Sequence, residues 1–300
     1  MAKLLWRILV TLGVIAISLN LADRLARRGA ALPAPPQPNG YEQLLAIARE
    51  LSVPQTELAE LGADAVRQLA RTNAAALGRL PAAFAAESAV PLQPGRAWMD
   101  AHADDLKRLK RLAVALGLQS RAATLDGNTN QSAHGWIDTI QLGQALGRSG
   151  LLVDGITALT IETIGAASLR AQLPQLDAGF CRNAAQELER AEGRRAAPED
   201  ILKTEKAWSH ASFGLVSRIG GFLTRRADQQ RAADFTKRSH DTTRRTRRLI
   251  VALATRAVEL ESGKPVAALT ELVPGVLRAV PLDPASRQPL TDARDATPAR

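Results

Sequence analysis

The first thirty residues constrain this chain most, because they contain one long apolar run. Residues 4–22 are apolar except at four positions. An α-helix rises about 1.5 Å per residue, so the run spans ~28 Å, close to the ~30 Å hydrocarbon core of a bilayer. It predicts one transmembrane helix ahead of a polar domain.

A cleaved signal peptide is the alternative for this run. Lys3 and Arg7 form a basic start, and an apolar middle of suitable length follows them. The cleavage site is poor, because Asn20 stands where a small residue is preferred. Trp6 and Arg7 also suit the membrane interface, where an aromatic ring is stable and an arginine can extend toward the headgroups. We therefore expect a retained anchor.

The flanking charges do not decide the orientation of this anchor. Lys3 and Arg7 precede the middle of the run, while Arg24, Arg27 and Arg28 follow it. Long domains cross the membrane largely regardless of flanking charge. The chain is therefore predicted to be a single-pass protein of the cell membrane with its main domain outside the cytoplasm.

The composition predicts an all-α domain. Hydrophobic residues make up 46% of the chain but aromatic residues only 3%, so Leu, Ala, Val and Ile must form the core, as in closely packed helices. Cys181 is the one cysteine, which excludes an intramolecular disulfide and any multi-cysteine metal site. The formal net charge is +9, and residues 1–30 carry +4 of it. The remaining excess permits contact with anionic partners without selecting one.

Proline and glycine divide the chain into five parts. An anchor with a basic flank (1–30) leads into a proline-rich linker (31–40), which we interpret as a semi-extended stalk. Apolar residues at helical spacing then predict an irregular bundle of about seven helices (41–262). A short proline-rich segment (263–290) is expected to act as a structural latch, and a polar tail (291–300) is expected to be disordered.

Residues 150–169 are apolar enough to suggest a second membrane span. Asp154 and Glu162 argue against it, because each would cost ~2.5 to 3.5 kcal/mol at the bilayer centre. Just before this stretch, Gly143 and Gly147 form a small-xxx-small pair, which in a soluble bundle permits close helix packing. We expect this region to be the central core of the domain.

Asp154 and Glu162 are the candidate functional acids. Their separation of eight residues places them about 80° apart around a helix, so both can face one cleft. Alternatively, each bonds a buried arginine or a backbone donor. A hydrolytic enzyme using these acids with His134 or His210 is one hypothesis. No catalytic residue, metal or cofactor is predicted outright, since no phosphate loop or nucleophile elbow is present.

Two histidines have carboxylates nearby in the sequence, but each set is at most half of a metal site. His134 lies four residues before Asp138, and helix caps or solvated polar faces explain such spacings more often. The second set consists of His102 with Asp100, Asp104 and Asp105.

The strongest electrostatic feature is a basic tract with one acid, Asp241. Its basic members are Lys237, Arg238, Arg244, Arg245, Arg247 and Arg248. Guanidinium groups suit phosphate oxygens, so the tract can contact anionic lipid or an envelope polymer. A membrane-tethered nucleic-acid binder is a further hypothesis, less favoured because interleaved aromatic residues are missing. A solvated or ion-paired helix face is the plain structural alternative.

The clearest family resemblance is at the end of the chain. The pattern G-x-P-x-x-x-L-x-x-L-V-P begins at Gly263, and L-x-x-V-P-x-D-P begins at Leu277. This ending resembles that of a family of uncharacterised bacterial proteins with an N-terminal membrane segment and a long helical domain. Residues 142–165 are also similar to their central segment. The resemblance covers much of the chain but brings no known activity with it. Our first hypothesis is a binding or scaffolding component of the cell envelope, with a protein partner as one expectation.

The P-x-D-P element is also similar to the tails of type II secretion pseudopilins. The chain departs from that class because its anchor lacks the prepilin cleavage motif and its glutamate. Ala285 and Ser286 also stand where aromatic residues are usual.

Overall fold

The computed structural model describes residues 32–54, 60–223 and 225–291, and within them the fold is entirely helical. The predicted all-α class is therefore confirmed, while the predicted transmembrane helix at 4–22 lies outside the described residues, as does the tail beyond 291. Nine α-helices and two 3-10 turns are described: α2 (Gly40–Arg49), α3 (Ala63–Leu77), α4 (Leu80–Ala85), α5 (Arg96–Leu125), α6 (Thr129–Leu146), α7 (Leu152–Gln172), η2 (Leu173–Gln175), α8 (Ala178–Glu192), α9 (Pro198–Leu223), α10 (Arg225–Ser262) and η3 (Leu269–Leu272).

The expected number of about seven helices is too low for two reasons. Pro81 is a helix breaker in the interior of a helix, but here it lies in the first turn of α4, where its missing N–H has no cost. The long apolar stretch after Trp136 forms two helices, α6 and α7, because residues 147–151 turn the chain back. In that turn Ser149 has a positive φ of 51°.

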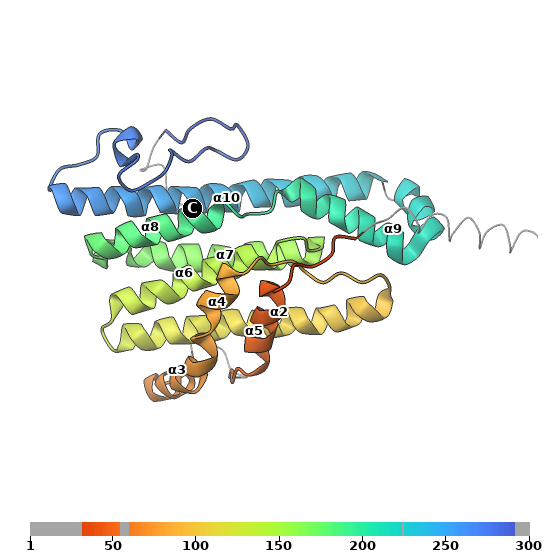
Figure 1. The fold of residues 1–300 in the computed structure, drawn as a ribbon, viewed down its shortest axis with the longest axis horizontal. Coiled ribbons are helices and arrows are strands. Elements are labelled where there is room, and N and C mark those ends of the chain that lie inside the picture. Colours follow the sequence, from red (N-terminus) through yellow and green to blue (C-terminus); the bar gives the residue numbers. More distant parts are fainter. Residues whose placement is uncertain (1–31, 55–59, 224, 292–300) are drawn as a thin grey trace, which may run out of the picture.

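The long helices run along a common direction in one stack (Figure 1). α6 packs against α5 on one side and α7 on the other, and α10 packs on both α7 and α8. The short helix α2 packs against α5 and α4, and α4 also contacts α6. Both short helices lie toward the α5 side of the stack, away from α10 (Figure 1). This order places α7 in the middle, with α5 and α10 as neighbours on different sides.

α6 and α7 approach each other closely because glycines stand at their contact. A Cβ atom on Gly143 would lie 2.7 Å from the carbonyl oxygen of Ala158, and one on Gly165 would lie 3.0 Å from the backbone nitrogen of Ile140. Real Cβ atoms essentially never come within 3.0 Å of another atom, so position 143 requires glycine. The 3.0 Å at Gly165 is tighter than nine in ten real Cβ contacts, so an added methyl group would force its neighbours to shift. Gly147 is less constrained, since its Cβ would meet Ala158 Cβ at an ordinary 3.5 Å.

Two apolar cores fill the stack. The first joins α2, α4 and α5 to the facing ends of α6 and α7, with Trp208 from α9. The second joins the other halves of α6 and α7 to α8, α10 and the chain after residue 262. Cys181 is fully buried in the second core, and burial raises the pKa of its thiol to about 11.

Residues 263–290 cover the second core. Leu272, Val276 and Leu277 are buried against α8 and α10. Arg182 of α8 donates to the Gly275 carbonyl oxygen at 2.7 Å, and Arg247 of α10 donates to the Leu282 carbonyl oxygen at 2.6 Å. The segment is thus held both by apolar packing and by arginines that bond its backbone.

The proline-rich linker is exposed over most of its described length but is tied at its ends. Leu32 packs partly against the first core. Asn39 is buried, where its amide donates to the Ala89 carbonyl oxygen at 2.8 Å and its side-chain oxygen caps α2 through the Tyr41 N–H at 3.1 Å. A stalk that projects freely cannot therefore extend to residue 40.

One helix among the described residues is long and apolar enough to cross a membrane by length and composition, namely 152–175, with a mean hydropathy of 1.3 over its best window. Half of this most apolar stretch of the helix is buried inside the bundle. Its two acids, Asp154 and Glu162, are at most 1% exposed. The helix is the middle of a packed stack, which is the usual setting of a core helix.

Candidate functional site

Asp154 lies at the start of α7 and bonds in two directions. One carboxylate oxygen accepts the Leu151 N–H at 2.7 Å, which caps the helix, and the other lies 2.7 Å from His102 Nε2 on α5. Glu205 of α9 accepts the neighbouring Leu152 N–H at 2.8 Å. Two carboxylates thus satisfy the N–H groups at the positive end of the α7 dipole, a favourable arrangement.

Aromatic rings enclose the His102–Asp154 pair. The imidazole stacks on Trp98 with ring centroids 4.6 Å apart, and the centroid of the Tyr41 ring lies 6.4 Å from it. The Tyr41 hydroxyl is buried and has no hydrogen-bond partner in the described part of the chain. Burial, followed by the nearby Asp154 charge, raises the pKa of Tyr41. His102 is 3% exposed, so this centre is closed to solvent.

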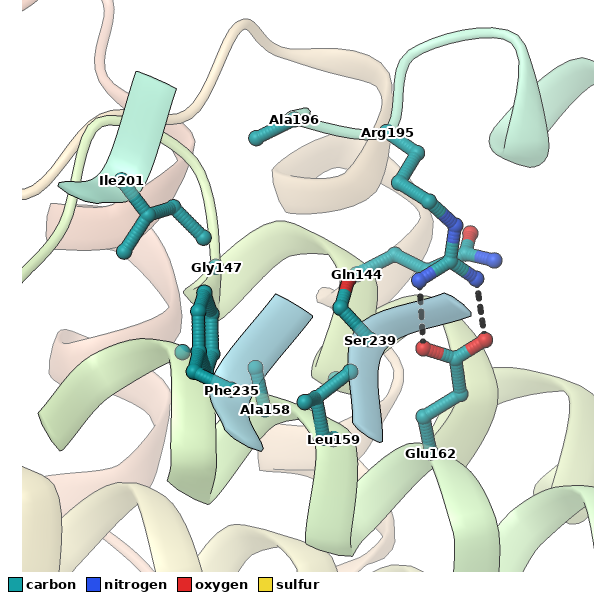
Figure 2. Close-up of a pocket in the computed structure, with 12 residues that line it drawn as sticks. Gln144, Gly147, Ala158, Leu159, Glu162, Arg195, Ala196, Ile201, Phe235 and Ser239 are labelled. Atoms are coloured by element: carbon teal, nitrogen blue, oxygen red, sulfur yellow. Dashed lines mark hydrogen bonds and ion pairs between the residues drawn. The ribbon is translucent and has the colours of Figure 1, made fainter. Parts of the chain in front are cut away.

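Glu162 lies two turns further along α7 and faces other partners. Arg195, from the connection between α8 and α9, donates to the Glu162 carboxylate from both terminal nitrogens, one of them at 2.9 Å (Figure 2). The Thr246 hydroxyl of α10 donates to the same carboxylate at 2.6 Å. Bidentate guanidinium contacts of this kind are among the strongest in proteins.

Arg195 continues the network to a second acid. Its Nε donates to Glu192 at 2.8 Å, and Glu192 also accepts from Arg247 at 2.9 Å. Burial alone lowers the pKa of Arg195, but the charges of Glu162 and Glu192 outweigh it and raise that pKa. Burial also raises the pKa of Glu192, against the opposing pull of the two arginines. The cluster of two acids and two arginines is neutral and joins α7, α8 and α10.

A small cavity lies beside the Glu162–Arg195 pair, with Gly147, Ala158 and Phe235 among its walls (Figure 2). Its volume of about 20 Å³ is close to that of a single water position. Glu162 lines it, whereas Asp154 points to α5. The two acids therefore do not share this cavity, and each has the kind of buried partner that the structural alternative expects.

A larger cavity opens where three connections meet at the same end of the stack. Residues from the end of α4 and the chain after it, from the α6–α7 turn, and from the α8–α9 connection with the start of α9 form its walls. Its volume is about 570 Å³. Its charged lining residues are Glu87, Arg148, Arg194 and Asp200. Sequence reasoning missed this site, because its residues are spread over more than a hundred positions and form no motif.

The basic tract on α10 divides into two sets. Lys237, Arg238 and Arg245 are exposed. Arg244 is ion-paired with Asp241 and Asp283. The other two predicted members turn toward the protein: Arg247 contacts Glu192, and Arg248 is partly buried. Two of the six cations, Arg244 and Arg247, are thus ion-paired, and three others lie on the exposed side of the helix.

Of the candidate histidines, His102 pairs with the buried acid Asp154, whereas His134 pairs with Asp138 on its own helix. His134 lies 3.6 Å from Asp138 on the exposed side of α6, and the Asp138 hydrogen bond raises its pKa. His210 is on α9. In the described ranges, no three His, Cys, Asp or Glu side chains come together as a metal site.

No family model, curated protein or solved structure matches the chain.

Proposed function

We propose that the protein is a single-pass membrane protein whose helical domain is a binding or scaffolding component of the cell envelope, placed outside the cytoplasm. The observation that carries the membrane assignment is the apolar run at 4–22, long enough to cross a bilayer and followed by a basic flank. Leu32 packs on the domain only ten residues after this run, so the domain would lie close to the bilayer surface.

The binding role is supported by the large cavity among the three connections. Its volume of about 570 Å³ falls in the range of small-molecule sites, and both charged and hydroxyl side chains line it. The resemblance of the tail to membrane-anchored bacterial proteins agrees with this proposal. The paired state of Arg244 and Arg247 makes the nucleic-acid alternative less favoured, since these guanidinium groups already have carboxylate partners.

Membrane fractionation with a topology reporter tests the proposal. We expect the full-length chain to stay in the membrane pellet after alkaline extraction and to leave it only in detergent. Deletion of residues 4–22 should release it. A reporter fused after Arg300 should be active outside the cytoplasm.

A matched variant tests whether residues 4–22 or α7 hold the chain in the membrane. Ile156→Asp with Ile164→Asp adds two charges to the exposed side of α7, where these side chains are 43% and 52% exposed. If residues 4–22 form the anchor, this double variant stays in the membrane pellet like the parent chain. Recovery of the intact full-length chain in the soluble fraction would overturn the proposal.

A further inference from the structure

Arg148 carries the most poorly balanced charge in the large cavity. It is half-buried and forms no salt bridge with any described residue, and its Nε is buried without a hydrogen-bond partner. Burial, followed by repulsion from Arg194 and Arg195, lowers its pKa to about 10, and Glu87 opposes this only weakly. Arg195, by contrast, is fully compensated by two glutamates. A buried N–H donor without a partner is costly, and so is a guanidinium charge that no anion balances.

Arg194 is held beside it in a fixed position. Its guanidinium donates to the Phe84 carbonyl oxygen at 3.0 Å, which uses one of its five N–H groups. Both arginines line the same cavity. Two arginines that line one space are an arrangement by which proteins bind carboxylate and phosphate groups.

Further donors come from hydroxyl groups on different elements. Ser149 from the α6–α7 turn and Thr204 from α9 both line the cavity. Ser149 adopts a left-handed conformation, with a φ of 51°, which is unfavourable for a residue other than glycine. The turn thus combines a strained residue with an unbalanced charge, and such local conflicts concentrate at functional sites.

The acids in the walls restrict the ligand. Glu87 and Asp200 line the same cavity, so a polyanion would meet repulsion there. We propose that the cavity binds a small molecule through one compact oxyanion, a phosphate or carboxylate group, held by the guanidinium groups of Arg148 and Arg194 with the Ser149 and Thr204 hydroxyls as further donors. This inference rests on the binding role proposed above and names its ligand class.

The test uses the purified full-length chain in a non-ionic detergent. Thermal unfolding and calorimetric titration are followed with sodium phosphate and sodium acetate, each against sodium chloride at equal ionic strength. We expect a saturable rise in Tm with phosphate or with acetate. The anion that gives a saturable rise in Tm shows whether the site binds phosphate or carboxylate groups. If neither anion gives a saturable rise, the proposal is overturned.

Variants locate the response. Arg148→Gln removes the unbalanced charge, so it should leave the ligand-free Tm unchanged or raised while weakening anion binding at least tenfold. Arg194→Gln, a second variant, should also weaken binding. Arg245→Gln makes the same charge change on the exposed side of α10 and should bind like the parent chain.

Two results would contradict the site. One is Arg148→Gln with a native circular dichroism spectrum and unchanged affinity. The other is an equal loss of affinity in Arg245→Gln, which would mean that general charge attracts the anion. Because these measurements are made in detergent, their outcome is independent of where the chain partitions in the cell. Failure of the anion site and failure of the membrane assignment are therefore distinguishable.

Discussion

Arg195→Met should strongly destabilise the domain, because it leaves the Glu162 carboxylate buried without its cation. Glu162 is 1% exposed, and its remaining side-chain partner would be the Thr246 hydroxyl. Removing one partner of a buried ion pair costs about 3–5 kcal/mol. The stranded carboxyl can instead take up a proton, and protonating an ordinary glutamate at pH 7 costs about 3.7 kcal/mol. We expect a loss of about 3–4 kcal/mol in the free energy of unfolding at pH 7.

The same reasoning predicts how this loss changes with pH. At pH 5, protonating an ordinary glutamate costs only about 1 kcal/mol, so the penalty of the variant should shrink by about 2–3 kcal/mol. Urea unfolding of the full-length chain, followed by circular dichroism at 222 nm, measures both values. A penalty below 1 kcal/mol at pH 7, or an equal penalty at the two pH values, would refute the reasoning.

Two controls belong to this experiment. Lys107→Met breaks an exposed pair with Asp104, whose side chains are 74% and 59% exposed, and should leave the free energy of unfolding almost unchanged, because solvent screens exposed pairs. Arg195→Met combined with Glu162→Gln removes both ends of the buried pair. The double variant should be more stable than Arg195→Met alone, because no charge is left stranded.

Three further outcomes are expected. Gly143→Ala would place a methyl group 2.7 Å from a carbonyl oxygen of α7 and should cost about 1–3 kcal/mol in urea unfolding, whereas Gly147→Ala, with 3.5 Å of room, should be nearly neutral. The Cys181 thiol should react with a thiol reagent at pH 8 only at the rate of unfolding, since its pKa is about 11 and it is buried; fast labelling of folded protein would contradict this. The Arg244 hydrogen bond lowers the pKa of Asp283, so this group contributes stability above about pH 4 that is lost as the pH falls. Asp283→Asn should therefore lower the free energy of unfolding by about 1–2 kcal/mol at pH 7 and reduce its fall at acid pH. If the free energy of unfolding of the variant falls at acid pH as steeply as that of the parent chain, this contact is not the cause of the fall.

Local signals predicted the helical class well. Leu and Ala at spacings of three and four residues, with few aromatic residues, predict helices whatever their tertiary partners are. The same spacing could not show that residues 129–172 fold into two helices, because the apolar pattern continues through both of them. The turn itself does have a signal, namely Gly147 and the Ser149–Gly150 pair. Pro81 is ambiguous in the sequence, since a proline breaks the interior of a helix but fits its first turn.

The partners of the buried acids were beyond sequence reasoning. Glu162 pairs with a residue 33 positions away and Asp154 with one 52 positions away, and only the stacking of α7 between α5 and α10 brings them together. Polarity in an apolar helix indicated that both acids would need partners. Which cation or ring would supply them depends on the tertiary arrangement, and the same holds for Arg148 and Arg194 in the large cavity.

The C-terminal segment described above has a consequence for biosynthesis. α8 and α10 bury part of their apolar surface only under Leu272, Val276 and Leu277, which leave the ribosome after every helix has been made. Until then this surface is open to other chains, and a chaperone or the remaining segment must cover it. The protein is therefore expected to depend on residues 263–290 for solubility far more than the length of that segment suggests.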